Sequence, residues 1–441
     1  MRRLPPAART FAIAVATLLA VSSPALATAR ADARSAVTRL ATPDKLTSAK
    51  AVSGPLPGET TFVWQTTGRY TDHFTITTAL TPFGGRHTPK VGRNSRTFTA
   101  GGGRRSRTLT PAETAAAGAG LGTGRHLFFR IKAVNSNGTA SKVQPYPYLR
   151  TATVRGQRSQ LAGTHLRFGE YNVQLKIADV RHHRWRHRQH LVARSIARTR
   201  PAVLGIQELV PAMWTHDDGG IGLHASLRHA GAGSYRLTRT TSYFHRAPQD
   251  TRILYDSSRV AMTSSCPTTR PSCYIALPNP DHRLVASWAR FRDLASGQQF
   301  YVVSAHLSHG NTAATDSLRG RQAEAIDAGI RAINTQGLPV VFATDANSSQ
   351  TSKGVDAPHT ALLRAGWYNA LAAAKTVNGG YNTVNGYQFP QHRSPWGFGS
   401  MYDTIMTLHM PGADQFKQIL AVSPGPSDHN LVLADLRLPA A

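Results

Sequence analysis

Carboxylate, amide and imidazole side chains follow or border short apolar runs in the second half of the chain. The central run, from Val340 to Ala343, is followed by Asp345 and Asn347. Its β-branched and aromatic content favours a strand that is buried on both faces of a sheet. An Asp and an Asn two positions apart at a strand end lie close enough to share one ligand, and open α/β sheets carry their chemistry at the carboxyl ends of strands. Alone, Asp-x-Asn is more typical of an Asx-turn that closes a strand.

Five further apolar runs show the same arrangement. They end at or border Asn172, Glu208, His306, Asp403 and the triplet Ser427-Asp428-His429. Taken singly, Glu208 could begin a helix, where a carboxylate is stabilising, and a lone His at a strand end is usually a hydrogen-bonded structural residue. Six such endings are harder to explain as scattered turns. We therefore expect these side chains to meet at one rim of a sheet.

The residue types at these endings suit a hard metal ion. Oxygen ligands from Glu, Asp and Asn favour Mg²⁺, with Mn²⁺ or Ca²⁺ as alternatives, over Zn²⁺. Such an ion polarises a phosphoryl oxygen and neutralises developing charge, while a His supplies acid or base chemistry near neutral pH. The pattern therefore indicates metal-assisted chemistry at phosphorus.

The order of the motifs adds a resemblance to a known family. The set comprises Tyr171-Asn172, Gln207-Glu208, Ser304-Ala-His306-Leu, Thr344-Asp345-Ala-Asn347, Tyr402-Asp403-Thr-Ile and Ser427-Asp428-His429. It resembles the endonuclease/exonuclease/phosphatase superfamily, the group that includes DNase I, from about residue 166 to the C-terminus. The resemblance implies a four-layer α/β sandwich, with two central sheets flanked by helices, and metal-dependent hydrolysis of a phosphoester.

The same resemblance implies roles for the ligand and water-handling residues. Glu208 would be the principal metal ligand, with Asn172 and Asp428 close to the same ion or to a second one. Asp345 would orient or deprotonate the attacking water, and Asn347 would hold a phosphate oxygen.

The two imidazoles would share the remaining chemistry. His429, steadied by Asp403, would be the general base or would stabilise the transition state. His306 would contact the scissile phosphate or protonate the leaving oxygen. The sequence does not decide which His has which role.

This chain departs from the family pattern at two positions. Thr344 stands where the family usually has Gly, and Ala202 stands where it usually has Asp. Neither change removes a proposed ligand, so we expect an active enzyme. Asp250 is a candidate acidic partner for His306, and Arg283 is a candidate phosphate clamp or an ordinary surface residue.

The beginning of the chain predicts export. Residues 1–27 comprise a basic leader, an apolar run too short to span a bilayer comfortably, and an Ala-x-Ala site, as in a secretory signal peptide. An uncleaved anchor is the alternative. In an exported protein the two cysteines, Cys266 and Cys273, are expected to form a local disulfide and not a metal site. The mature protein is therefore predicted to be secreted and soluble.

The charge of the chain favours anionic partners. It carries 51 Lys and Arg against 23 Asp and Glu, a formal net charge of +28. Such an excess favours nucleic acid or an anionic membrane surface, although arginine-rich composition also arises from a GC-rich genome. Residues 181–200 alone hold seven Arg and four His and no acid, which predicts a basic outer surface on a helix from Arg184 to Arg200.

A separate β module is expected before the phosphoesterase-like region. After a linker over 28–45, residues 46–155 show short alternating runs separated by turn residues, typical of a small antiparallel sandwich. The run from Phe129 to Ser141 resembles the penultimate strand and turn of fibronectin type III modules, with Trp64 as a buried early aromatic. We expect this module to be a spacer or a binding accessory, followed by the catalytic domain over 166–441.

Three functions remain open at this point. The leading one is a secreted nuclease acting on DNA, and on RNA as an extension. The loop from Gly386 to Phe398 interleaves aromatic and basic residues that could stack on bases. The same loop would suit a sphingomyelinase-like enzyme that presses aromatics into phospholipid, or it packs internally around Trp396. A non-catalytic adhesion protein is the third possible function, and the intact set of acidic and histidine residues argues against it.

We expect a monomer with no stable protein partner.

Overall fold

The computed structural model describes the greater part of both predicted domains. The described residues are 42–53, 59–79, 95–118, 126–141, 148–151, 164–176, 183–215, 221–238, 251–264, 273–279, 284–349, 356–393, 399–410 and 413–439. The predicted leader, most of the linker, Asp250, Cys266, Arg283 and Trp396 lie outside these residues. The expectations placed on them, including the disulfide between Cys266 and Cys273, therefore stay predictions.

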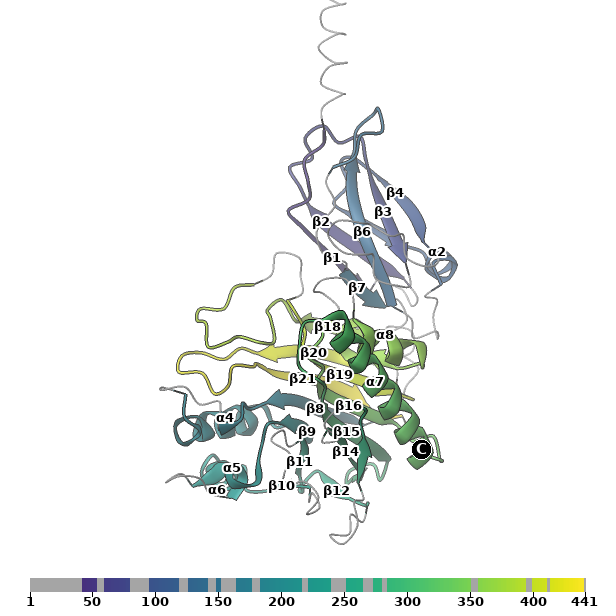
Figure 1. Ribbon diagram of the computed structural model, residues 1–441. Helices are drawn as coiled ribbons and strands as arrows, with labels where there is room; N and C mark the ends of the chain where they lie inside the picture. Colours follow the sequence, from purple (N-terminus) through teal and green to yellow (C-terminus); the bar gives the residue numbers. More distant parts are fainter. Residues whose placement is uncertain are drawn as a thin grey trace, which may run out of the picture.

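The amino-terminal part is built from two antiparallel sheets (Figure 1). One sheet has the order β1 (Ser48–Ser53), β2 (Thr60–Gln65), β5 (Ser106–Leu109). The other has the order β4 (Arg96–Gly101), β3 (His73–Ala79), β6 (His126–Val134), β7 (Tyr148–Thr151). A short helix, α2 (Pro111–Ala116), follows β5 and begins at a capping box between Thr110 and Glu113.

Aromatic side chains join these two sheets. The ring of Phe62 lies 4.8 Å from that of Phe129, and the ring of Trp64 lies 5.0 Å from that of Phe74. All four are fully or almost fully buried. The predicted small β sheets and the buried Trp64 are therefore present, while the assignment to fibronectin type III modules stays a prediction.

The second part contains two larger sheets, called here sheet I and sheet II. Sheet I has the order β10 (Tyr235–Leu237), β11 (Arg252–Asp256), β9 (Val203–Gln207), β8 (His165–Asn172), β21 (Leu431–Arg437), β20 (Ala413–Ile419), β18 (Ala374–Asn378). Sheet II has the order β12 (Val260–Met262), β14 (Val285–Asp293), β15 (Gln299–His306), β16 (Val340–Asp345), β19 (Asp403–Leu408), β17 (Tyr368–Asn369), and β13 (Tyr274–Ala276) also pairs with β14.

Helices cover the outer face of each sheet. The helices beside sheet I are α4 (Trp185–Thr199), α5 (Pro211–Thr215) and α6 (Gly222–His229); those beside sheet II are α7 (Ala313–Ile333) and α8 (Ala357–Arg364) (Figure 1). In the chain, α9 (Ala370–Ala373) lies between β17 and β18. Val192 and Ile196 of α4 pack on sheet I, and Ile326 and Ile330 of α7 pack on sheet II. A third apolar core, in which Phe168 meets Phe300 edge to face at 5.5 Å, lies between the sheets. This order of helix, sheet, sheet and helix confirms the predicted four-layer α/β sandwich.

The predicted basic helix is present and has the expected apolar face. Trp185, Val192 and Ile196 are buried on one side of α4, and the helix ends at Arg200, whose φ of 47° stops it before Pro201. Most arginines of the basic run are exposed, as expected for a basic outer surface, but Arg188 is buried. Among the described helices, none has the length and apolarity needed to cross a membrane.

Close contact between the sheets depends on Gly205 of β9. A Cβ atom at this position would lie 2.6 Å from the Cβ of Ala343 and 3.2 Å from the Oγ of Ser304. Both are short, rigid side chains, so the sheets would have to separate to admit the extra carbon. Gly205 is therefore required by the distance between the sheets.

We expect Gly205→Ala to lower the free energy of unfolding by roughly 1–3 kcal/mol, the usual cost of overpacking a tight core. Urea denaturation followed by circular dichroism measures the effect. Gly233→Ala is the matched control, because its Cβ would meet its nearest neighbour, Arg228, at an ordinary 3.5 Å. Equal stability of the two variants would contradict a packing role for Gly205.

Candidate active site

Side chains change from apolar to polar along the inner faces of both sheets. On β8, Leu166 and Phe168 belong to the core between the sheets, and Glu170 and Asn172 follow on the same face. On β15, Val302 is followed by Ser304 and His306 on that face. The polar residues lie at the same end of the sandwich, since Nδ2 of Asn172 lies 3.1 Å from Oδ2 of Asp345, which is the register partner of His306. The strand alternation thus forms the predicted rim.

Three neighbouring strands of sheet II align their polar residues. His306 is the register partner of Asp345, and Asp345 is the register partner of Asp403. Asp403 begins β19, which runs antiparallel to β16, so a strand start and a strand end meet at one rim. Three residues that are distant in the sequence therefore lie side by side.

Asp345 is the centre of the polar cluster. Its Oδ2 atom lies 3.1 Å from Nδ2 of Asn172, 3.4 Å from Nε2 of His306 and 3.9 Å from Nε2 of His429. Its Oδ1 atom accepts a hydrogen bond of 2.9 Å from the backbone N–H of Asn347. Burial favours the neutral acid, but the two imidazoles and these hydrogen bonds outweigh it, and the pKa of Asp345 falls below its usual value.

His429 is held by Asp403. Nδ1 of His429 lies 2.9 Å from each carboxylate oxygen of Asp403, which leaves Nε2 facing Asp345. Burial opposes the charged imidazole, but the charges of Asp403, Asp345 and Asp428 and the hydrogen bond that Nδ1–H donates to Asp403 raise the pKa of His429 well above its usual value. This pKa shift favours the charged imidazolium form of His429. The pairing of His429 with Asp403 that the resemblance implied is therefore present, while the role of His429 stays a prediction.

Asn172 and Glu208 form a second group on the other side of Asp345. Nδ2 of Asn172 donates to Oε1 of Glu208 at 2.9 Å, and Oε2 of Glu208 accepts from the backbone N–H of Leu175 at 2.6 Å. Glu208 does not begin a helix, since α5 starts at Pro211. Its φ of 63° is unusual for a Glu, and such strain concentrates at functional sites.

The remaining predicted residues lie at the edge of this cluster. Nδ2 of Asn347 donates to the backbone carbonyl of Leu307 at 2.9 Å, and the residue adopts a left-handed φ of 46°. Asp428 accepts from Nε2 of Gln174 at 3.1 Å and lies beside Ser427. Asp428 acts on His429 through its charge, so its place among the metal ligands stays a prediction.

His306 has acidic neighbours that the sequence did not indicate. Its Nε2 atom faces Asp345, and its buried Nδ1 atom lies 4.0 Å from Oε1 of Glu208 without a hydrogen-bond partner. Glu208 and Asp345 are therefore acidic neighbours of His306, while the candidate partner Asp250 lies outside the described residues and stays a prediction. No local pattern could reveal this, because Glu208 and Asp345 belong to different sheets.

Glu170 is a second residue that the sequence analysis missed. Its side chain is fully buried next to Asp403, and burial together with the charges of Asp403 and Asp345 raises its carboxyl pKa well above the usual value. It is therefore a neutral acid within the cluster. The available signal was its position two residues before Asn172, which places it on the same strand face.

Arg188 fixes the loops at the rim. Its guanidinium donates to the backbone carbonyls of Val173 at 2.7 Å, of Gln174 at 3.1 Å and of Pro426 at 3.1 Å. The segments after β8 and before β21 are therefore tied to helix α4.

The loop at Gly386 is partly packed against the rim. The ring of Tyr387 stacks on that of His183 at 3.6 Å, and its hydroxyl donates to Oε1 of Gln174 at 2.5 Å. This ring is thus engaged within the protein. Residues 394–398 of the loop lie outside the described residues.

The donor set at the rim fits a hard divalent cation. Asp345, Asp403 and His429 each offer one ligand atom within 4.8 Å of one another. Asp403 is engaged by Nδ1 of His429, and Glu208 offers a carboxylate on the opposite side. Asn172 turns its Nδ2 toward Glu208 and Asp345, while its Oδ1 accepts from the backbone N–H of Gln174 at 2.9 Å. In a chain of formal charge +28 the site gathers five acidic side chains, and such a concentration of oxygens suits Mg²⁺ better than Zn²⁺. The members are Glu170, Glu208, Asp345, Asp403 and Asp428.

Comparison with solved structures finds similar chains over this second part. An endonuclease/exonuclease/phosphatase from Bacteroides vulgatus is 20% identical, with 62% of this chain and 99% of that chain covered at a TM-score of 0.49. A mannosyl-6-phosphatase from Bacteroides thetaiotaomicron is 16% identical, with 62% and 99% covered at 0.46. The human Nocturnin catalytic domain with bound sulfate is 15% identical, with 64% and 98% covered at 0.44. No protein-family model and no curated protein matches the chain. At these identities and TM-scores the activity has to be judged from the side chains of the site.

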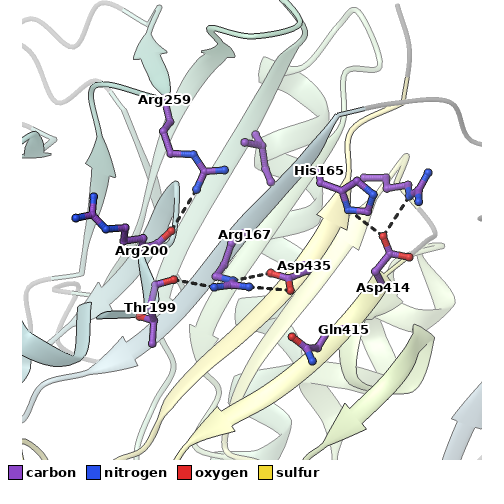
Figure 2. A pocket seen from close by; sticks show the side chains of 10 residues that line it. His165, Arg167, Thr199, Arg200, Arg259, Asp414, Gln415 and Asp435 are labelled. Carbon is purple, nitrogen blue, oxygen red and sulfur yellow. Dashed lines mark hydrogen bonds and ion pairs between the residues drawn. The ribbon is translucent and has the colours of Figure 1, made fainter. Parts of the chain in front are cut away.

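A large hollow at the opposite end of β8 is lined by paired charges (Figure 2). It has a volume of about 720 Å³. Arg167 binds both carboxylate oxygens of Asp435, at 2.7 and 3.1 Å, and Asp414 receives His165 at 2.9 Å and Arg437 at 3.1 Å. These contacts join β8, β20 and β21. The hollow is therefore best explained by an ion-pair network and lies away from the polar rim.

The charge state of His429 gives a testable pH dependence. In metal-free protein, NMR titration of His429 should give a midpoint above the usual value of about 6.5. Asp403→Asn should lower that midpoint, because it removes the main group that favours the imidazolium. Since the folded-state pKa is raised, this interaction stabilises the fold fully below about pH 6.5 and is lost as pH rises through the folded-state pKa. Asp435→Asn, far from the rim, should leave the titration unchanged, and a wild-type midpoint at or below 6.5 would contradict the prediction.

Proposed function

We propose that this protein is a divalent-cation-dependent phosphodiesterase that hydrolyses nucleic acid. The proposal rests on the environment of Asp345. Two imidazoles and the amide of Asn172 surround its carboxylate. Glu208 lies on one side of it, and the pair of Asp403 and His429 lies on the other. Two sets of groups on opposite sides of one carboxylate suit a displacement at phosphorus, in which attacking and leaving oxygens lie in line.

Each side chain has a defined task in this proposal. Asp345 stays ionised and accepts a hydrogen bond from the attacking water, which it orients toward phosphorus. His429 donates through Nε2 to a phosphoryl oxygen, since Asp403 holds its Nδ1–H and keeps the ring charged. His306 lies on the other side of Asp345, where it can contact the phosphate or protonate the leaving oxygen. Asn347 supplies an amide donor for a phosphate oxygen.

Glu208 and Asn172 would hold the cation, with Asp428 as a further ligand. A bound Mg²⁺ would polarise a phosphoryl oxygen and neutralise the charge that develops on it. Mn²⁺ and Ca²⁺ also bind to oxygen ligands of this kind and are the alternatives to test.

The choice of nucleic acid rests on charge. The formal charge of +28 favours a polyanion, and Arg184 is exposed beside His183, whose ring stacks on Tyr387 at the rim. The proposal includes export through the leader over 1–27, a monomeric enzyme, the local disulfide, and a fibronectin type III-like module as a spacer. Arg283 is retained as a phosphate contact within this proposal.

A phospholipid substrate is the second candidate. Val384 is 36% exposed, and its backbone bridges to that of His429, so an apolar side chain stands at the rim. An exposed apolar residue beside a catalytic site is suited to contact with a lipid surface.

Incubation with several phosphodiesters separates these candidates. Purified protein is mixed with supercoiled DNA, RNA or sphingomyelin vesicles, in Mg²⁺ or in EDTA. Cleavage of DNA that is abolished by EDTA and by His429→Ala supports the nuclease. Turnover of sphingomyelin alone would replace it by the lipid enzyme, and hydrolysis that is unaffected by His429→Ala would refute the site.

A further inference from the structure

A groove on the outer face of sheet I lies between helix α4 and the segment that joins β20 to β21. Its volume is about 670 Å³, within the range of about 300–1,000 Å³ that is usual for ligand pockets. Most of its lining is apolar: Tyr171, Leu191, Ala197, Ala230, Ile419, Leu420, Ala421, Val422, Pro424, Pro426 and Leu431. The groove is separate from the polar rim, because Tyr171 points to the opposite face of β8 from Asn172.

The groove leaves apolar surface in contact with water. Val422 is 73% exposed, the most exposed of the large apolar side chains in the described residues, and Leu420 is half-buried. Covering apolar surface yields about 25 cal/mol per Å², so the groove favours a ligand with a hydrocarbon portion.

The wall of the groove is cationic. Arg194 and Arg198 lie one turn apart on α4, and His229 closes the far side at the end of α6. No acidic residue lines the groove, and within the described part of the chain neither Arg194 nor Arg198 has a carboxylate partner. The groove therefore combines an apolar lining with the positive charges of Arg194 and Arg198.

We propose that this groove binds a single-chain anionic amphiphile from solution, a hydrocarbon tail with a carboxylate or phosphate head. The tail would cover Leu420 and Val422, and the head would pair with Arg194 and Arg198. A neutral ligand would leave both guanidinium groups without a counter-charge. A nucleic acid would need several exposed rings for stacking on successive bases. The ring of Tyr171 is only 1% exposed, which leaves the imidazole of His229 as the single exposed ring in the lining.

Decanoate is the probe, used below its micelle concentration, with decanol as the uncharged molecule of equal chain length. Isothermal titration calorimetry should show one saturable decanoate site and at least about tenfold weaker binding of decanol, as expected when charge-assisted bonds are lost. The double substitution Arg194→Ala/Arg198→Ala should lower the affinity for decanoate by at least about tenfold. The matched control is Arg321→Ala/Arg364→Ala, which removes two exposed arginines from the helices beside sheet II and should leave the affinity unchanged.

A second pair of variants tests the apolar part. Val422→Asp should lower the affinity for decanoate by at least about tenfold, because it puts a carboxylate where the hydrocarbon tail would lie. The control, Leu294→Asp, changes another exposed apolar side chain, 48% exposed against 73% for Val422, in the turn after β14, and should have no effect on decanoate binding. Circular dichroism and thermal unfolding of each variant show whether the fold is retained.

Several outcomes would overturn the proposal. They are the absence of saturable decanoate binding, equal binding by the Arg194/Arg198 variant, and binding to phosphatidylglycerol vesicles or to an acidic peptide without binding of decanoate. The test is independent of catalysis, since Asp345→Asn should bind decanoate with wild-type affinity even when hydrolysis is lost.

Discussion

Asp345→Asn is expected to lower kcat on a phosphodiester substrate by at least about a thousand-fold. Loss of a positioned acid or base typically costs about 10²–10⁴ in rate. The substitution also removes the charge that the two neighbouring imidazoles face, which adds to the loss. Asparagine keeps the shape of the side chain but removes the negative charge that orients water and faces His306 and His429. The measurement is steady-state cleavage of fluorescently labelled DNA in saturating Mg²⁺. Because the loss concerns the chemical step, KM should change far less than kcat.

Asp72→Asn is the control for this prediction. Asp72 is a surface carboxylate of the amino-terminal part, with its side chain 58% exposed, and its removal should leave kcat unchanged. Folding of both variants is checked by circular dichroism. A kcat for Asp345→Asn within about tenfold of wild type would show that this carboxylate does not take part in the chemistry.

Glu208→Gln is expected to reduce activity by at least about a hundred-fold at low Mg²⁺ and to raise the Mg²⁺ concentration needed for half-maximal rate. The glutamine retains an oxygen but loses the charge with which a hard cation interacts most strongly. Binding of Mn²⁺ followed by electron paramagnetic resonance gives a readout that does not depend on turnover. It should show weaker binding of the ion by the variant than by the wild type.

The matched control is Glu324→Gln on α7, where the carboxylate is exposed and outside the site. This variant should have the Mn²⁺ affinity and the Mg²⁺ dependence of the wild type. If Glu208→Gln bound Mn²⁺ as tightly as wild type does, the cation would have to be assigned to another set of ligands. The group of Asp345, Asp403 and His429 would then be the next set to test.

The positions of the site residues along the chain followed from local patterns. The apolar run before Asp345 is the fully buried strand β16, and the spacing of Trp185, Val192 and Ile196 is the buried face of α4. These patterns depend on strand and helix periods, which are properties of a short segment. That several polar strand ends share one rim could also be expected, because parallel strands end on the same side of a sheet.

The partners of the site residues did not follow from such patterns. The pKa of Glu170 is raised by its complete burial between the sheets, and then by the charges of Asp403 and Asp345, which belong to the other sheet. Arg188 was part of a basic run that suggested solvent exposure, yet it is buried because loops before β21 and after β8 present carbonyls to it. The burial of a side chain and the charges next to it depend on how the two sheets face each other. A local sequence pattern does not give the distance between residues on different sheets.

The sequence by itself determined which residue types end each strand, the amphipathic face of α4 and the large excess of positive charge. Only the tertiary structure decided that Asp345 lies between His306 and His429, and that an apolar groove with a cationic wall stands behind the rim. The physical reason is that hydrogen bonds and pKa shifts act over a few ångströms. Side chains that are tens or hundreds of residues apart reach such distances only when the two sheets pack together.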